Sequence, residues 1–286
     1  MRISVVIPTL GTRSTYLEEA LQSIIEQTLL PNEIIVVNNG PHPIRLDMLS
    51  MATELPIKNL RTVYGAGVAQ ARNVGATFAN GDVVAFLDDD DLWGEHYLEY
   101  SLMELVSSDS KCVLGRIDKL VDGVVTKFFN ATGHLDAHSF MVMNPGATGS
   151  NVLIYKDTFL EVGGYDIALP PTEDGALIVS LLDLGIKVSV NSDAQALMRI
   201  HSNERLTNPR SAAIGFKAFY LKYRGRLEIR DRIYLIWKYR REEFKATRSL
   251  ITLLWFGFYS FLIIVCNRRP RTYWTHPEAN SGEKSK

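Results

Sequence analysis

The chain has 286 residues, of which 46% are hydrophobic and 22% are charged, a composition that excludes a disordered or collagen-like protein and favours a globular fold with a large core. The net charge is −1, but residues 210–286 contain 17 Lys and Arg against 6 Asp and Glu, whereas the rest of the chain contains 14 against 26. An acidic body with a basic tail predicts an anionic partner surface. The apolar segment within that tail favours a membrane surface over nucleic acid.

The first half of the sequence alternates strand and helix patterns. Residues 3–7 predict a buried strand, since this apolar run is too short for a signal segment. Thr15 and Glu18 have capping-box spacing and predict the start of a helix that ends before Pro31. Residues 33–37 and 83–87 predict two further strands, with a helix at 68–79 between them. This order favours an α/β/α sandwich with a mostly parallel central sheet.

The second half of the sequence does not continue this regular alternation of strands and helices. Residues 112–127 predict an antiparallel hairpin that turns at Asp122 and Gly123. A helix is expected at about 94–107, a strand at 150–155, and helices at 156–162 and 174–184 that end at glycines. From residue 211 onward the pattern is helical, basic and aromatic. We therefore expect a catalytic domain over 1–210, with halves at 1–110 and 111–210, followed by a helical tail over 211–286.

Three polar loops follow the predicted strands directly. They contain Pro8 and Thr9, then Asn38 and Asn39, and then four consecutive aspartates at 88–91. Because ligands in open α/β sheets bind beyond the carboxyl ends of the strands, these loops are expected to share one crevice.

The four aspartates are Asp88, Asp89, Asp90 and Asp91. Four adjacent carboxylates repel one another, and a divalent cation such as Mn²⁺ or Mg²⁺ would relieve that repulsion while binding phosphate oxygens. The alternative is a solvated loop that caps the next helix.

Four more residues are candidates for the site. Glu173 and Asp174 open a predicted helix, where they either cap it or supply a general base. His201 follows a short strand and is either structural or a metal ligand. Arg72 lies on an early helix and is either on the surface or a phosphate contact.

Taken in order, these segments resemble glycosyltransferase family 2, whose members have the GT-A fold. The segments that carry the resemblance are residues 4–9, 29–37, 71–75, 81–91, 163–166 and 173–174. The resemblance extends from residue 3 to about residue 203. The ordered set is specific, although each motif alone is weak.

The resemblance implies an inverting transferase that takes a sugar from a nucleotide-diphosphate sugar. Asp88 and Asp90 match the D-x-D element that contacts the ribose and the metal, and Asp91 could exchange roles with Asp90. Asp174 matches the catalytic base, with Glu173 in support.

The remaining matches concern the donor pocket. Thr9 and Arg72 match positions that line the nucleotide pocket, together with Pro8 and Asp89, and His201 matches a histidine near the metal and diphosphate in some members. Asn38 and Asn39 depart from the pattern, because the family commonly has an aspartate there to read the base. An asparagine can still donate and accept hydrogen bonds to a base.

Residues 250–266 form an uncharged apolar run with basic residues on both sides. As a helix it would span roughly 25 Å, somewhat less than the hydrocarbon core of a bilayer. We expect an interfacial or re-entrant helix, with a single crossing or a core helix as alternatives. The two cysteines, Cys112 and Cys266, show no metal-ligand spacing and predict reduced thiols.

These features predict an enzyme on the cytoplasmic side of the inner membrane. It would transfer a sugar to a saccharide or lipid-linked saccharide in the synthesis of a bacterial surface polysaccharide, such as O-antigen or capsule. One alternative is a non-catalytic nucleotide-sugar-binding protein of the same fold. Another is a metal-dependent phosphohydrolase, for which the sequence offers no second metal cluster or nucleophile.

Overall fold

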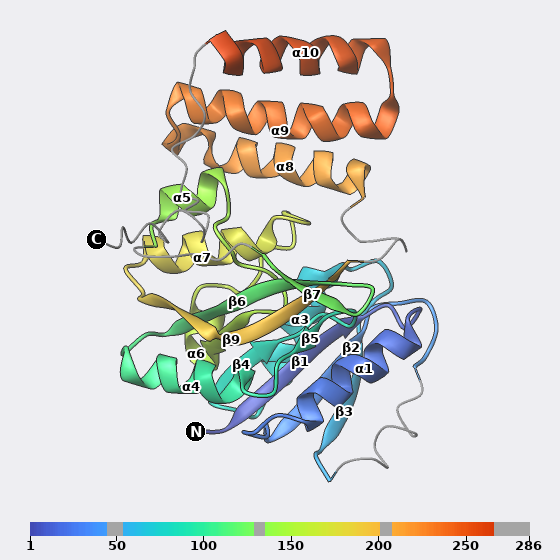
Figure 1. Cartoon of the computed structure of the whole chain (residues 1–286), viewed down its shortest axis with the longest axis vertical. Helices are drawn as coiled ribbons and strands as arrows, with labels where there is room; N and C mark the ends of the chain where they lie inside the picture. The colour runs from blue at the N-terminus through green and yellow to red at the C-terminus, as the bar shows by residue number, and fades with distance from the viewer. Residues whose placement is uncertain (45–53, 129–134, 201–207, 266–286) are drawn as a thin grey trace, which may run out of the picture.

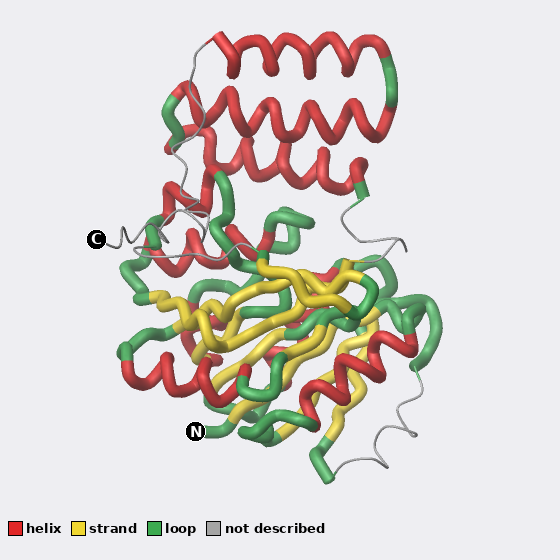
Figure 2. Tube along the Cα trace, in the orientation of Figure 1, coloured by secondary structure: helices red, strands yellow, loops and turns green. Residues whose placement is uncertain are grey.

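The computed structural model describes residues 1–44, 54–128, 135–200 and 208–265 (Figure 1). A mixed β-sheet occupies the lower part of the molecule in this view, and three long helices stack above it (Figure 2). His201 and Cys266, both named above, lie outside the described residues.

Four strands form the parallel half of the sheet. They are β1 (Ile3–Thr9), β2 (Glu33–Asn38), β3 (Ile57–Arg61) and β4 (Val83–Phe86). Their spatial order is β3-β2-β1-β4, and all neighbouring pairs are parallel. Every residue of β1, β2 and β4 is buried, which explains their unbroken apolar runs. The sequence pattern did not reveal β3, because this edge strand is only partly buried and carries polar residues.

The other half of the sheet corrects the prediction of a mostly parallel sheet. It contains β8 (Val152–Tyr155), β6 (Cys112–Val121), β9 (Val188–Ile200), β5 (Leu92–Trp93) and β7 (Val124–Lys127). Strand β8 is antiparallel to both β4 and β6, and the pairs β5–β9 and β6–β7 are also antiparallel. The sheet is therefore mixed, since β8 returns through its middle in the reverse direction.

The predicted hairpin at β6 and β7 is confirmed. Asp122 and Gly123 both have positive φ angles, 49° and 79°. Two such residues in sequence form the turn that matches the twist of an antiparallel ribbon, and Asp-Gly tolerates these angles well.

Helices cover both faces of the sheet, as predicted. Alternate residues of β1 point to opposite faces, so that Val6 joins one core cluster while Val5 and Ile7 join the other. The second cluster includes α1 (Ser14–Ile25) and α4 (Tyr97–Ser107). The first includes α3 (Val68–Phe78), α5 (Ala137–Val142), α6 (Lys156–Glu161) and α7 (Glu173–Asp183).

The predicted capping box of the first helix is wrong. Arg13, not a hydroxyl residue, occupies the N-cap of α1, and no side chain caps that end. Thr15 already lies within the first turn of the helix. As the site below shows, the Arg13 side chain pairs with two aspartates instead.

The helical tail begins with α8 (Pro209–Tyr223), a short 3₁₀ turn at Arg224–Arg226, α9 (Ile229–Thr247) and α10 (Leu250–Val265). Phe219 of α8 and Leu235 of α9 join the core cluster that contains α7. Helix α10 stacks on the outer side of α9 (Figure 1), where Trp237 Nε1 donates to Ser260 Oγ at 3.0 Å.

No residue of α10 is buried, and its apolar side chains include Leu250, Leu254 and Ile264, each at least 65% exposed. Within the ranges that the structure describes, none of the helices has the length and apolar character needed to cross a membrane. The domain boundary at residue 210 stays a prediction.

Candidate active site

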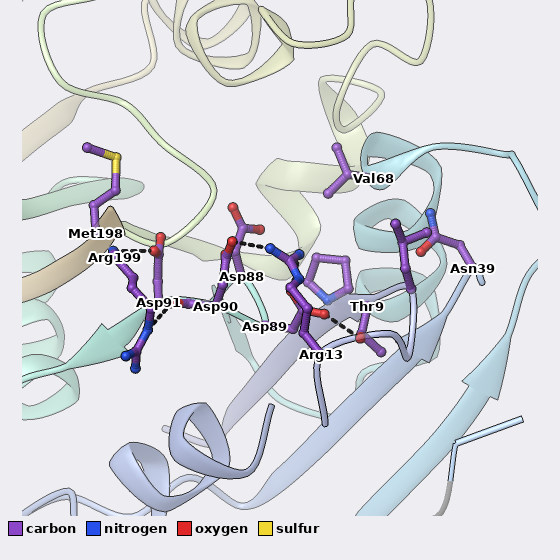
Figure 3. A pocket seen from close by; sticks show the side chains of 12 residues that line it. Thr9, Arg13, Asn39, Val68, Asp88, Asp89, Asp90, Asp91, Met198 and Arg199 are labelled. Atoms are coloured by element: carbon purple, nitrogen blue, oxygen red, sulfur yellow. Dashed lines mark hydrogen bonds and ion pairs between the residues drawn. The ribbon is translucent and has the colours of Figure 1, made fainter. Parts of the chain in front are cut away.

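A pocket of about 140 Å³ lies where β1, β2 and β4 end, so the predicted convergence of three strand-end loops is confirmed (Figure 3). Val68 and Asn39 lie at one end of it, and Met198 and Arg199 lie at the other. The residues that line it are Pro8, Thr9, Leu10, Arg13, Asn39, Val68, Asp88, Asp89, Asp90, Asp91, Met198 and Arg199.

The four aspartates after β4 fall into two pairs. The side chains of Asp88 and Asp90 are 30% and 17% exposed, whereas the side chain of Asp89 is 3% exposed and Asp91 is buried. Asp89 accepts a hydrogen bond from Thr9 Oγ1, and Asp91 accepts one from Ser150 Oγ at 2.6 Å. Asp89 and Asp91 thus anchor the loop, whereas Asp88 and Asp90 are more exposed and form ion pairs with Arg72 and Arg13.

Burial changes the protonation of the anchoring pair. It raises the pKa of Asp89 to about 6, although Arg13 opposes this shift. For Asp91, burial and then the neighbouring carboxylates of Asp90 and Asp88 raise the pKa to about 8. At neutral pH the carboxyl group of Asp91 is therefore mostly protonated.

Arg13 is a site residue that the sequence patterns did not reveal. Its guanidinium pairs with Asp89 at 2.6 Å and also with Asp90. It lies at the start of α1, and nothing in the local pattern distinguishes it from a surface arginine. Only the return of β4 beside β1 brings it to the aspartates.

Arg72 connects the aspartate loop to helix α7. It lies on α3 and is only 2% exposed, which excludes the alternative of a surface arginine, and its contact with a phosphate stays a prediction. Its Nη2 lies 2.5 Å from Asp88, and its Nη1 lies 3.2 Å from Glu173 and 3.3 Å from Asp174. Burial alone would lower the pKa of Arg72, but these carboxylates raise it above its usual value. The guanidinium is therefore permanently charged.

Glu173 and Asp174 form the first turn of α7, where the helix dipole favours negative charge. Glu173 is 2% exposed, and the side chain of Asp174 is 17% exposed. Burial raises the pKa of Asp174 above the usual carboxyl range, and Arg72 opposes this shift without cancelling it. The pKa of Glu173 is raised for the same reason. A carboxylate with a raised pKa is the stronger base.

Gly149 makes room for this arrangement. A Cβ atom at residue 149 would lie 1.7 Å from Arg72 Nη2 and 2.6 Å from Asp88 Oδ2. Glycine is therefore required for Arg72 to reach Asp88. The sequence carried no sign of this role, because Gly149 precedes an ordinary strand and follows no recognisable motif.

The remaining predicted site residues divide as follows. Pro8, Thr9 and Asn39 line the pocket. Asn38 is buried beneath the loop, where its Nδ2 donates to the carbonyl of His42 at 2.7 Å and its Oδ1 accepts from the Gly40 backbone at 2.8 Å. The side chain of Asn38 thus helps to hold the loop in shape. A contact between a nucleobase and either Asn38 or Asn39 stays a prediction.

No group of three or more potential protein ligands for a metal comes together among the residues that the structure describes. A magnesium or manganese ion that bridges phosphates commonly takes only one or two carboxylates and completes its shell with water and phosphate oxygens. Asp88 and Asp90 supply oxygen donors of this kind at the pocket. The donor set therefore fits such an ion, and which of the aspartates bind it stays a prediction.

Comparison with known proteins identifies a family. Residues 4–156, more than half of the chain, match the family model described as Glycosyl transferase family 2. Among curated relatives, an uncharacterized glycosyltransferase of Bacillus subtilis, YwdF, is 37% identical over 109 residues, which are 38% of this chain and 40% of YwdF.

A second relative has a specific name. The Escherichia coli protein WfgD, a UDP-Glc:alpha-D-GlcNAc-diphosphoundecaprenol beta-1,3-glucosyltransferase, is 25% identical over 127 residues, 44% of this chain and 50% of WfgD. The chain thus aligns with no more than half the length of either relative.

Among solved structures, S. aureus TarS 1-349 in complex with UDP-GlcNAc is similar with a TM-score of 0.65 and 17% identity, over 93% of this chain and 82% of that one. This likeness concerns the fold, and it agrees with the GT-A-like architecture that the sequence predicts.

Proposed function

The chain belongs to glycosyl transferase family 2, and from this membership we propose that it transfers a sugar from a nucleotide-diphosphate sugar to an acceptor hydroxyl with inversion at the anomeric carbon. One observation carries the proposal. The guanidinium of Arg72 joins Asp88, at the tip of the central strand, to Asp174, on a helix 102 residues further along the chain than Arg72. The carboxylate assigned to the metal ion and the carboxylate assigned as the general base thus contact the same guanidinium group.

The donor is assigned to the pocket lined by Thr9, Asn39 and the aspartates. TarS, which shares the fold, is solved with UDP-GlcNAc, and this supports a nucleotide sugar as the donor class. Arg13 and Arg72 form ion pairs with the aspartates, and guanidinium groups bind phosphate oxygens well. We assign them to the diphosphate of the donor.

Asp174 is assigned as the general base. Its raised pKa suits it to accept a proton from the acceptor hydroxyl, and its side chain is partly exposed. Glu173 is more deeply buried and holds Arg72 in place, which makes it a positioning residue. One direct displacement by the activated hydroxyl inverts the sugar without a covalent intermediate.

We assign Mn²⁺ or Mg²⁺ to Asp88 and Asp90. When bound, such an ion would neutralise the charge that develops on the diphosphate leaving group. Asp91 and His201 were predicted as further ligands, but Asp91 is engaged by Ser150 and by the Arg199 backbone, and His201 lies outside the described residues.

The acceptor is proposed to be a lipid-linked saccharide of bacterial surface polysaccharide synthesis. The name of WfgD specifies an acceptor sugar on diphosphoundecaprenol, which supports this class. The exposed apolar side chains of α10 and the basic residues of the tail support a peripheral position on the cytoplasmic face of the inner membrane.

The proposal is tested by incubating the purified chain with several nucleotide sugars, Mn²⁺ and a short-chain lipid-linked acceptor, and by measuring sugar transfer, donor hydrolysis and donor binding separately. The expected result is transfer from one donor with inverted configuration. Asp174→Asn should lose transfer but keep donor binding. Asp183→Asn is its matched control, because Asp183 lies at the other end of α7 in an exposed pair with Arg226. Binding of a donor without transfer or hydrolysis would instead identify a non-catalytic binding protein.

A further inference from the structure

A second pocket of about 260 Å³ lies between the helical tail and the first turn of α7. Its walls are mainly apolar and come from three helices, with Phe140 and Met141 on α5, Phe216 and Phe219 on α8, and Leu235 on α9. Thr172 and Gly175, which flank Glu173 and Asp174, form its edge toward the active site. The pocket is therefore within one helical turn of the proposed base.

One cation lines this apolar pocket. Lys238 of α9 has its Nζ 4.6 Å from the ring centroid of Phe216 and 5.8 Å from that of Tyr234. Among the described residues, no acceptor is hydrogen-bonded to this ammonium group. The nearby carboxylate of Glu242 already accepts from Arg241 and Lys245, at 2.8 Å and 3.0 Å.

The ammonium group remains a cation under ordinary conditions. Burial and then the nearby Arg241 lower the pKa of Lys238 to about 8, and Glu242 opposes both. At pH 7 the group is therefore mostly protonated. A partly buried charge without an acceptor is costly, and an anion bound beside it would offset that cost.

We propose that this pocket binds the phosphate-bearing lipid end of the acceptor, with the phosphate at Lys238 and the first part of the hydrocarbon chain against the phenylalanines. The inference rests on the proposed function and adds the site that holds the acceptor. An apolar cavity with a single cation matches an amphiphile with an anionic head better than it matches a free sugar, whose hydroxyls would find few partners here.

The position of the pocket agrees with this assignment. Thr172 and Gly175 line it and flank Asp174 in the sequence, so a sugar attached to a phosphate in this pocket would be held near the turn that carries Asp174. It also lies one helix layer from α10, since α9 contributes Lys238 to the pocket on one side and contacts α10 through Trp237 (Figure 1). The pocket proposed for the lipid end is thus close to the helix proposed to lie on the membrane.

The test is direct binding of farnesyl phosphate to the full chain by isothermal titration, below the concentration at which the lipid forms micelles. We expect saturable binding with one site. Lys238→Met, which keeps the stem and removes the charge, should weaken binding about tenfold or more, because a charge-assisted hydrogen bond is lost. Lys238→Arg should restore most of it.

Lys217→Met is the matched control, because Lys217 is exposed on α8 and lies outside the pocket lining. It should bind farnesyl phosphate as the unchanged chain does. Farnesol should bind more weakly than farnesyl phosphate, and it should not distinguish Lys238→Met from the unchanged chain. Circular dichroism of each variant shows whether the fold is retained.

Three results would overturn the inference. The first is equal affinity of Lys238→Met and the unchanged chain for farnesyl phosphate. The second is an affinity for inorganic phosphate equal to that for farnesyl phosphate, which would make the pocket a simple anion site. The third is an affinity for dihexanoyl phosphatidic acid equal to that for farnesyl phosphate, which would assign the pocket to membrane phospholipid. A chain that transfers sugar but does not bind farnesyl phosphate would refute this inference alone, whereas one that binds it but neither binds nor consumes a donor would refute the proposed function.

Discussion

The guanidinium of Arg72 lies 3.3 Å from the carboxylate of Asp174, and the same group contacts Asp88 at 2.5 Å. A single buried side chain thus links the loop assigned to the donor and the helix assigned to the acceptor. Arg72 thus shares its charge among the three carboxylates of Asp88, Glu173 and Asp174.

Asp174→Asn should abolish sugar transfer and spare donor binding. Removing a general base typically lowers the rate by about 100-fold or more, while the amide keeps the size and polarity of the side chain. Transfer kinetics and donor titration check the two effects separately. Loss of donor binding in this variant would contradict the assignment of Asp174 as the base.

Arg72→Met should destabilise the chain as well as inactivate it. Without the guanidinium, Glu173 and Asp174 lose their buried counter-charge, and breaking a buried ion pair costs about 3 kcal/mol or more. Urea unfolding followed by circular dichroism measures the free energy. Arg226→Met is the control, because its pair with Asp183 is exposed and should contribute at most about 1 kcal/mol. Equal costs for the two variants would refute the bridging role.

Gly149→Ala should reduce transfer by about 100-fold, since a displacement of roughly 1 Å within a site has effects of this size. The new methyl group would collide with Arg72 and Asp88 and push them apart. Gly225→Ala is the matched control, because no atom lies within 4 Å of a Cβ atom at that position. A Gly149→Ala enzyme of normal activity would show that the contact between Arg72 and Asp88 is dispensable.

Chelation should stop transfer, and Mn²⁺ should restore it. Asp90→Asn is expected to raise the Mn²⁺ concentration needed for half of full activity by about tenfold or more, because a charged oxygen ligand becomes a neutral one. Activity is measured across a Mn²⁺ titration after dialysis against a chelator. Asp193→Asn, at an exposed position on β9, should leave the titration unchanged. Full activity in the chelator would exclude the assigned ion.

Without metal, the free energy of unfolding should fall as the pH rises from 5 to 8. The folded state raises the pKa of Asp91 to about 8, whereas the pKa of an unfolded aspartate is about 3.9. The folded chain then binds more protons than the unfolded chain between these values. The contribution is therefore fully present below the unfolded pKa and is lost as the pH rises through the folded one.

Asp91→Asn should reduce this pH dependence by up to about 1 kcal/mol per pH unit. The amide carries no ionisable proton, and Ser150 can either donate to it or accept from it. Denaturant unfolding at several pH values provides the comparison. An unchanged slope in the variant would show that Asp91 is already ionised in the folded chain.

Local patterns in the sequence were enough to predict the strands β1, β2 and β4 and the hairpin, and to recognise the ordered family motifs. Unbroken apolar runs report burial on both faces, and the Asp122-Gly123 turn depends only on its own backbone angles. The candidate carboxylates could be named for the same reason, since they directly follow strands or open a helix. The direction of β8 and the partial burial of β3 could not be read in this way, because pairing partners are set by distant parts of the chain.

Long-range packing decided how the site is organised. The division of the four aspartates into a more buried and a more exposed pair depends on Thr9, Arg13 and Ser150, which approach from separate elements. The family motif named Arg72 as a candidate, but its carboxylate partners are known only once α3, β4 and α7 are packed together. Nothing in the sequence distinguished Lys238 from the other basic residues of the tail, and its place in the second pocket depends on how α5, α8 and α9 pack. The sequence determines which side chains can carry a charge. Their burial and their partners, which set their pKa values and their reactivity, depend on contacts between residues far apart in the chain.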